Sequence, residues 1–171
     1  MSKGDPAAIE LLVLDVDGVL TDGRLIFDDV GRESKSFNAK DGAGIKYWHR
    51  AGKKSAFLTG RDSPIVARRG AELGVHAIRQ GALVKLPVLL EILSELGVPP
   101  EKAAYVGDDL PDVPSMRHCG LAITVADAVD EVKAISDWIS PRIGGAGAVR
   151  WAIERLLKAS GQWTAIMERY E

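Results

Sequence analysis

The sequence predicts an α/β fold in which helices cover both faces of a doubly wound parallel sheet. Apolar runs of strand length alternate along the chain with segments of helical period, which is the rhythm of such folds. Right-handed crossovers between these units make the sheet parallel. The 171 residues, 46% of them apolar and 27% charged, suit one globular domain with a buried core. We therefore expect a single Rossmann-like domain over residues 1–171.

The expected elements follow one another in a regular order. The predicted strands are Ile9–Leu14, Ser55–Leu58, Val75–Ile78, Ala103–Val106 and Leu121–Val125. The predicted helices are Gly42–Ala51, Pro64–Leu73, Val84–Leu96, Asp109–Arg117 and Ala148–Ala159. We expect Asp41 to cap the first helix and Gly52 to end it. Ser63 stands before the second helix and Gly74 closes it.

One stretch after the first strand breaks this rhythm. Gly23–Phe27 and Glu33–Phe37 flank Asp28–Gly31, whose residues are typical of a turn between two short strands. This pattern predicts an inserted β-hairpin over about residues 23–37. Neither residues 22–41 nor residues 61–85 leave room for a separate cap domain. The site would therefore be open unless another subunit covers it.

Composition excludes several classes of protein. The net charge is −2 and the basic residues are scattered, which argues against a nucleic-acid binder and favours a small-molecule partner. A lone cysteine, Cys119, excludes an intrachain disulfide and a cysteine-based zinc site. No apolar run approaches the roughly 20 residues of a membrane span, and the first ten residues lack the apolar segment of a signal peptide. We expect a cytoplasmic protein.

Three polar clusters follow predicted strands. In a doubly wound sheet, ligands bind beyond the carboxyl ends of the strands, so these clusters are expected to converge. They are Asp15–Asp22, Thr59–Arg61 and Gly107–Asp112. Their carboxylates would repel one another without a cation, and oxygen-only ligands favour magnesium over zinc. The carboxylates are Asp15, Asp17, Asp108, Asp109 and Asp112. The clusters predict a magnesium site that receives a phosphoester.

The same clusters contain the groups that phosphoryl transfer requires. Asp15 is placed to attack phosphorus and form an acyl phosphate. Asp17 can protonate the leaving oxygen and later deprotonate the hydrolytic water. The Thr59 hydroxyl and the Gly60 amide can donate to phosphate oxygens, and Lys85 offers a positive charge to the developing negative one. Together these residues predict a magnesium-dependent phosphomonoesterase.

These motifs resemble the four motifs of the haloacid dehalogenase superfamily, in order and at ordinary spacings. They are Asp15–Val19, Thr59-Gly60, Lys85 and Gly107–Asp112. The resemblance continues through Phe37–Ile45, Gln80-Gly81, Ala104–Met116 and Gly144–Arg150, and so covers nearly the whole chain. Within the superfamily the chain is similar to the capless 3-deoxy-D-manno-octulosonate 8-phosphate phosphatases, which act in lipopolysaccharide sugar synthesis.

The resemblance implies an assembly and a set of metal ligands. It implies a homotetramer in which the hairpin of one subunit closes the active site of the next. It also implies that magnesium is held by the Asp15 and Asp108 carboxylates and by the backbone carbonyl of Asp17. Asp112 is then expected beside these ligands without binding the ion. Asp109 is assigned either to the same supporting position or to the start of a helix, where its charge suits the dipole.

The resemblance further implies that Arg61 and Arg69 handle the anionic sugar and phosphate. One departure stands in the glycine-rich segment, where Ala146 replaces the usual basic residue. That segment is expected to be a helix entry, although it could bind an anion.

Three other functions stay open at this point. The nearest is a phosphatase for a nonulosonate 9-phosphate, whose members typically carry glutamate where this chain has Arg61. A non-catalytic relative associated with a sugar nucleotidyltransferase is a second, and the intact motif residues argue against it. A phosphomutase is a third, disfavoured because no cap is available to retain an intermediate.

Overall fold

The computed structural model describes residues 4–170 and contains a six-stranded parallel sheet in the order β5-β4-β1-β6-β7-β8. The strands are β1 Leu11–Leu14, β4 Lys54–Leu58, β5 Ala77–Arg79, β6 Ala103–Gly107, β7 Leu121–Thr124 and β8 Trp138–Ile139. The predicted doubly wound α/β fold is confirmed. The five predicted strands lie within two residues of the observed ones at each end, while the short edge strand β8 was not predicted.

The sheet is held by a core that is apolar on both faces of its central strands. All four residues of β1 are buried, and β1 pairs with β4 on one side and with β6 on the other. Strands that are buried on both faces consist of continuous apolar residues, which is why they could be predicted from the sequence. Leu14 is opposite both Phe57 and Val106, so these three strands end almost level with one another.

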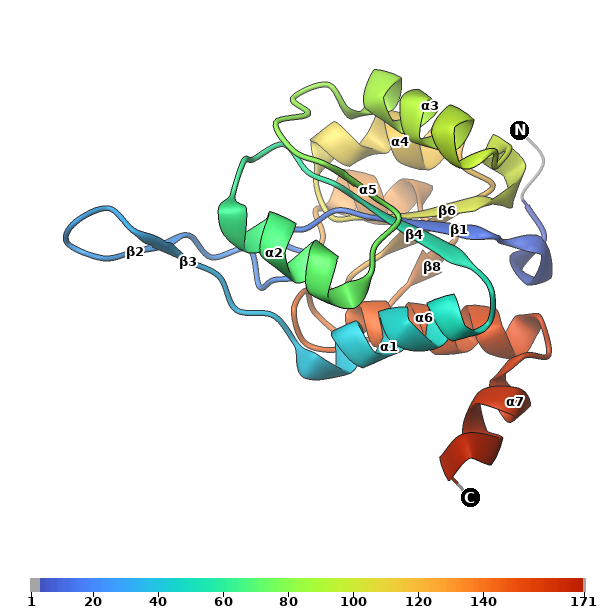
Figure 1. Cartoon of the computed structure of the whole chain (residues 1–171). Helices are drawn as coiled ribbons and strands as arrows, with labels where there is room; N and C mark the ends of the chain where they lie inside the picture. The colour runs from blue at the N-terminus through green and yellow to red at the C-terminus, as the bar shows by residue number, and fades with distance from the viewer. Residues whose placement is uncertain (1–3, 171) are drawn as a thin grey trace.

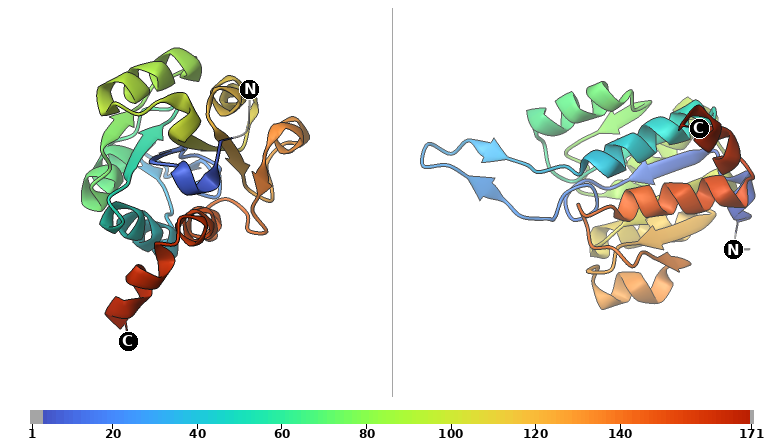
Figure 2. Two further views of the ribbon diagram at one scale, coloured as in Figure 1. Left: turned by 90° about the vertical axis from the view of Figure 1, so that its right-hand side faces the viewer. Right: turned by 90° about the horizontal axis from the view of Figure 1, so that it is seen from below.

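Two layers of helices cover the sheet (Figures 1 and 2). The helices are α1 Ala39–Arg50, α2 Pro64–Leu73, α3 Lys85–Leu96, α4 Val113–His118, α5 Asp130–Ile135 and α6 Ala148–Ala159. Helices α1, α2 and α6 lie on one face, and α3, α4 and α5 on the other. Right-handed connections require this arrangement, because the chain moves outward from β1 to β5 and then returns through β6 to β8.

Helix α1 begins three residues earlier than predicted, and Asp41 does not cap it. The cap is Asn38, whose side chain accepts a hydrogen bond from the amide of Lys40. Asp41 lies inside the helix, where it is buried and accepts hydrogen bonds from the amides of Gly147 and Arg150 at the start of α6. The carboxylate thus caps a helix more than 100 residues away. Gly74 ends α2 in the left-handed conformation, as predicted.

The predicted hairpin is present but its paired part is short. β2 spans Ile26–Phe27 and β3 spans Glu33–Ser34, joined through a turn in which Asp28 accepts hydrogen bonds from the Val30 and Arg32 amides. The hairpin extends well away from the sheet and its helices (Figures 1 and 2). No cap domain is present between residues 4 and 170.

The remaining elements complete the domain. The described part of the chain contains four short 3-10 turns, η1 Pro6–Ala8, η2 Pro100–Lys102, η3 Leu110–Asp112 and η4 Glu168–Tyr170. Turn η3 replaces the first turn of the helix predicted over residues 109–117. Helix α7, Trp163–Met167, was not predicted; Trp163 packs edge-on against Tyr47 of the same chain. Within residues 4–170, no helix has the length and apolar character needed to cross a membrane.

Candidate active site

The three polar clusters converge in one cavity of about 420 Å³ at the carboxyl ends of β1, β4 and β6. The cavity is lined by Asp15, Asp17, Gly23, Thr59, Gly60, Arg61, Ala82, Leu83, Lys85, Asp108, Asp109, Pro111 and Asp112. This placement follows from the register, because neighbouring strands that end level deliver the next residues to one point. All but one of the predicted site residues are brought together here.

The loop after β1 is tightly packed and depends on two glycines. Gly18 has a φ of +93°, and a Cβ at this position would lie 2.1 Å from Asp108 Oδ2. Gly144 approaches the same loop, where its Cβ would lie 1.9 Å from the Gly18 carbonyl oxygen. The glycine-rich segment before α6 therefore leads into that helix and supports this loop. This agrees with the expectation that the segment is a helix entry.

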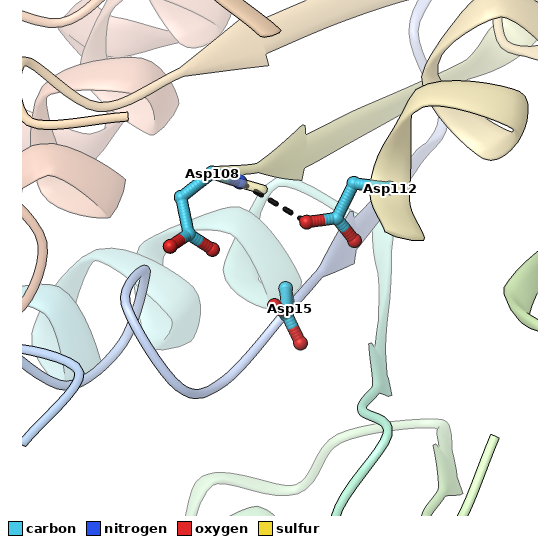
Figure 3. Close-up of side chains that lie close together, drawn as sticks. All are labelled: Asp15, Asp108 and Asp112. Atoms are coloured by element: carbon cyan, nitrogen blue, oxygen red, sulfur yellow. Dashed lines mark hydrogen bonds between the residues drawn. The ribbon is translucent and has the colours of Figure 1, made fainter. Parts of the chain in front are cut away.

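Three carboxylates form the centre of the cavity (Figure 3). Asp15, Asp108 and Asp112 each offer an oxygen, and these oxygens lie within 4.8 Å of one another. Burial raises the pKa of Asp15 to about 7, with a further contribution from the charge of Asp112. Burial also raises the pKa of Asp108 to about 8, with contributions from Asp15 and Asp112. Without a cation, burial and mutual repulsion therefore disfavour full ionisation of this cluster.

Asp112 differs from the other two because its oxygens are already engaged. Its Oδ1 accepts hydrogen bonds from Lys85 Nζ at 2.7 Å and from the Tyr105 hydroxyl at 2.8 Å. Its Oδ2 accepts hydrogen bonds from the amides of Asp108 at 3.1 Å and Asp109 at 3.3 Å. Four donors leave this carboxylate little capacity for a metal ion. By contrast, Asp108 Oδ1 is buried and accepts no hydrogen bond.

Lys85 is the first residue of α3 and lies between two of the carboxylates. Its Nζ is 2.9 Å from Asp15 Oδ1 and 2.7 Å from Asp112 Oδ1, and the side chain is only 5% exposed. Burial alone would lower the pKa of Lys85, but the charges of Asp15 and Asp112 outweigh it and raise the pKa. The ammonium is therefore a fixed positive charge next to Asp15.

The residues after β4 add a hydroxyl and backbone amides to the lining of the cavity. Thr59 is buried, and its Oγ1 accepts a hydrogen bond from the Arg61 amide at 3.4 Å. Gly60 lines the cavity without a side chain. Asp109 accepts a hydrogen bond from the Leu110 amide at 2.7 Å and so caps η3. That contact favours the helix-start interpretation of Asp109.

The hairpin contributes a charged network to the cavity mouth. Lys35 of the hairpin forms an ion pair with Asp17 and lies 3.4 Å from Glu33 Oε1. Glu33 in turn accepts hydrogen bonds from Arg61 Nη2 at 3.0 Å and from the Ser63 hydroxyl at 2.7 Å. The Lys35 side chain is 1% exposed although it comes from an extended hairpin. The hairpin base is thus tied to the site of its own chain.

Sequence reasoning missed three of these residues: Glu33, Lys35 and Tyr105. Alternation along a strand places Glu33 and Lys35 on one face, which was an available signal that both point the same way. Tyr105 stands in a buried strand, where a phenol needs a hydrogen-bond partner. That requirement could have directed attention to the neighbouring acidic cluster.

Arg69 is the predicted site residue that does not line this cavity. It donates to Glu72 Oε2 at 2.9 Å, and its guanidinium lies 5.8 Å from the centre of the Phe37 ring. It lines a second hollow of about 430 Å³ with Phe37, Ala39, Ile65, Arg68 and Glu72. The structure therefore separates Arg69 from Arg61.

Known proteins are similar to this chain in sequence and in structure. The family model of haloacid dehalogenase-like hydrolases matches residues 38–120. The 3-deoxy-D-manno-octulosonate 8-phosphate phosphatase of Haemophilus influenzae is 42% identical over 154 residues, which are 90% of this chain and 86% of that protein.

Two solved structures bear on the site. The Moraxella catarrhalis phosphatase of that name, in complex with a magnesium ion, a phosphate ion and KDO, has a TM-score of 0.95 at 38% identity, covering 98% of this chain and 96% of its own. The cobalt-bound H. influenzae enzyme has a TM-score of 0.91 at 40% identity, covering 94% of each chain.

Proposed function

Because the chain belongs to the family of 3-deoxy-D-manno-octulosonate 8-phosphate phosphatases, within the haloacid dehalogenase-like hydrolases, we propose that it hydrolyses that sugar phosphate to the free sugar acid and phosphate. The reaction belongs to lipopolysaccharide sugar synthesis. The observation that carries the proposal is the convergence of Asp15, Lys85 and Asp108 in one cavity beyond the sheet. We place this reaction in the cytoplasm as part of the proposal.

Magnesium fits the donors that this cavity offers. They are oxygens only, Asp108 Oδ1 is buried without a hydrogen bond, and the pKa values of Asp15 and Asp108 are raised by burial and mutual repulsion. A divalent cation would remove that repulsion and keep both groups ionised. We assign the Asp15 and Asp108 carboxylates and the Asp17 backbone carbonyl as its ligands. When bound, the ion neutralises charge on a phosphate oxygen.

Asp15 is the proposed nucleophile. It follows β1 directly, and its amide donates to the Val106 carbonyl at 3.0 Å, which fixes the backbone from which the side chain extends. An ionised carboxylate attacks phosphorus in line and forms an aspartyl phosphate, which water then hydrolyses. The Lys85 ammonium, 2.9 Å from Asp15 Oδ1, stabilises the ionised carboxylate and the charge that develops during transfer.

Asp17 is the proposed proton donor to the leaving alcohol. It stands two residues past the nucleophile at the cavity mouth, where a substrate's leaving oxygen would emerge. The same carboxylate, once ionised, can take a proton from the hydrolytic water. Thr59 and Gly60 face this path and are assigned to hold phosphate oxygens through a hydroxyl and an amide. Asp112 orients Lys85 and the loop of Asp108 through the four hydrogen bonds that it accepts.

Arg61 is the proposed contact for the substrate's carboxylate. Its side chain is 42% exposed at the mouth, and its Nε lies 3.9 Å from Asp17 Oδ2, which places it on the leaving-group side. A guanidinium can bind a carboxylate through two parallel hydrogen bonds. A substrate role for Arg69 remains a prediction without support from its position in this chain.

We further propose a homotetramer in which the hairpin covers a neighbouring site. Four apolar residues of the hairpin are about half exposed or more, namely Leu25, Ile26, Phe27 and Val30. Leu83, which lines the cavity, is exposed as well. A two-stranded hairpin that carries such a surface is stable only when it is packed against a partner.

A phosphate-release assay over a panel of sugar phosphates, with and without magnesium, tests the proposed function. We expect the highest kcat/KM for 3-deoxy-D-manno-octulosonate 8-phosphate and no turnover after chelation. A preference for a nonulosonate 9-phosphate would move the assignment to the alternative phosphatase. Absence of turnover on every ester would instead support the non-catalytic relative.

A further inference from the structure

A carboxylate of the protein already occupies the cationic corner beside the proton donor. Glu33 Oε1 lies 3.0 Å from Arg61 Nη2 and 3.4 Å from Lys35 Nζ, while Oε2 accepts the Ser63 hydroxyl at 2.7 Å. We propose that Glu33 is an internal competitor that holds the subsite of the substrate's carboxylate until the substrate displaces it. The inference rests on the proposed function, in which Arg61 binds a sugar acid.

The donors around Glu33 are those of a carboxylate subsite. Two cations and one hydroxyl converge on a single carboxylate, and Lys35 and Ser63 are both nearly inaccessible to solvent. Ser63 is also the N-cap of α2, yet its side chain makes no capping hydrogen bond because the hydroxyl points to Glu33. The hydrogen bond from Ser63 lowers the pKa of Glu33, so the side chain is a carboxylate at neutral pH. The Ser63 hydroxyl thus donates to a carboxylate instead of accepting a hydrogen bond from a backbone amide of α2.

The position of this corner relates it to the reaction. Lys35 pairs with Asp17, and Arg61 Nε lies 3.9 Å from the same aspartate, so the corner adjoins the group that protonates the leaving oxygen. A sugar acid that places its ester oxygen at Asp17 brings its carboxylate into reach of Arg61. Glu33 comes from β3 of the hairpin, so only its side chain has to leave Arg61 when a substrate carboxylate takes its place. Substrate binding therefore exchanges one carboxylate for another.

The exchange makes Glu33 a determinant of specificity. A ligand whose carboxylate must enter the subsite binds only to molecules from which Glu33 has withdrawn. Its apparent affinity is the intrinsic affinity multiplied by the fraction of such molecules. A small ester without a carboxylate, such as p-nitrophenyl phosphate, does not need Glu33 to leave. Since the ion pair of Glu33 with Arg61 is partly exposed and Ser63 adds only one hydrogen bond, we expect about a threefold to tenfold effect.

The test compares Glu33→Gln with Asp29→Asn, a variant with the same charge change at an exposed position of the hairpin turn. We expect Glu33→Gln to lower KM for the sugar acid phosphate about threefold to tenfold relative to p-nitrophenyl phosphate. Calorimetry should show tighter binding of the free sugar acid by the same factor. Asp29→Asn should change neither the ratio of the two KM values nor the affinity for the free sugar acid. Glu33→Ala, checked by circular dichroism, repeats the measurement without a residual amide.

Two outcomes overturn the proposal. If Glu33→Gln and Glu33→Ala raise KM for the sugar acid phosphate, Glu33 orients Arg61 for the substrate instead of competing with it. If their substrate ratios equal that of Asp29→Asn, Glu33 does not occupy the subsite. Arg61→Ala separates this failure from that of the proposed function. If this variant loses kcat/KM equally for the sugar acid phosphate and for p-nitrophenyl phosphate, Arg61 does not bind the substrate's carboxylate.

Discussion

Replacement of Tyr105 by phenylalanine tests the network that holds the catalytic lysine. The Tyr105 side chain is fully buried, and its hydroxyl donates to Asp112 Oδ1 at 2.8 Å, the same oxygen that accepts Lys85 Nζ. Phenylalanine keeps the ring and removes only this donor. Asp112, which is buried, then loses one of its four hydrogen bonds.

The expected loss follows from the kind of hydrogen bond removed. A hydrogen bond to a charged group contributes about 1.5–3 kcal/mol, which corresponds to a fall in Tm of about 3–12 °C for a domain of this size. Because Lys85 shares Asp112 Oδ1 with the phenol, we also expect kcat to fall. Differential scanning calorimetry and phosphate release measure the two effects.

A matched substitution gives the control. The Tyr47 hydroxyl accepts a hydrogen bond from the Tyr170 hydroxyl at an exposed position, so Tyr47→Phe should change stability by less than about 0.5 kcal/mol. The reasoning is refuted if Tyr105→Phe and Tyr47→Phe have the same Tm and the same kcat as the unmodified protein. That result would mean that Asp112 does not depend on the phenol.

Three further predictions concern the metal, the assembly and acid stability. Excess EDTA should abolish phosphate release and magnesium should restore it, and Asp108→Ala should behave like the chelated enzyme; full activity in EDTA, or a preference for zinc, would contradict the assigned ligands. Deletion of the hairpin, residues 23–37, should remove assembly and activity together. Light scattering that gives about 18.4 kDa for a fully active unmodified enzyme would refute the tetramer. Burial and the charge of His76 lower the pKa of His49 to about 4, below its ordinary 6.5. Between these two pKa values the unfolded chain binds a proton at His49 that the native protein does not, so the free energy of unfolding should decrease as the pH falls from 6.5 towards 4. His49→Gln should make this decrease smaller. Urea melts at several pH values that show the same decrease in the variant would contradict this prediction.

The fold could be predicted because its main signals are local. Buried parallel strands appear as apolar runs, and the helix Ala148–Ala159 was predicted with the observed ends because apolar period and glycines both mark it. The edge strand β8 has two residues, too few for a periodic signal. The Asp41 prediction failed because the nearest free amides, those of α6, are distant in sequence and become neighbours only when the chain folds.

The same distinction separates the parts of the site. The convergence of Asp15, Thr59 and Asp108 follows from topology alone, since parallel strands deliver their carboxyl ends to one edge. The contact of Lys35 with Asp17 depends instead on how the hairpin folds back over the site. The two residues are 18 positions apart, and the segment between them contains only the two-residue strands β2 and β3. These strands are too short for a periodic pattern that would predict the pair.

The most direct test of the mechanism is magnesium-dependent phosphate release by Asp15→Asn, measured beside the unmodified enzyme with circular dichroism of both. An amide cannot attack phosphorus, and removal of a negative charge from the cluster of Asp15, Asp108 and Asp112 relieves repulsion. We therefore predict a folded protein without turnover. Near-normal phosphate release from a folded Asp15→Asn variant would contradict the aspartyl phosphate and the role of the whole site.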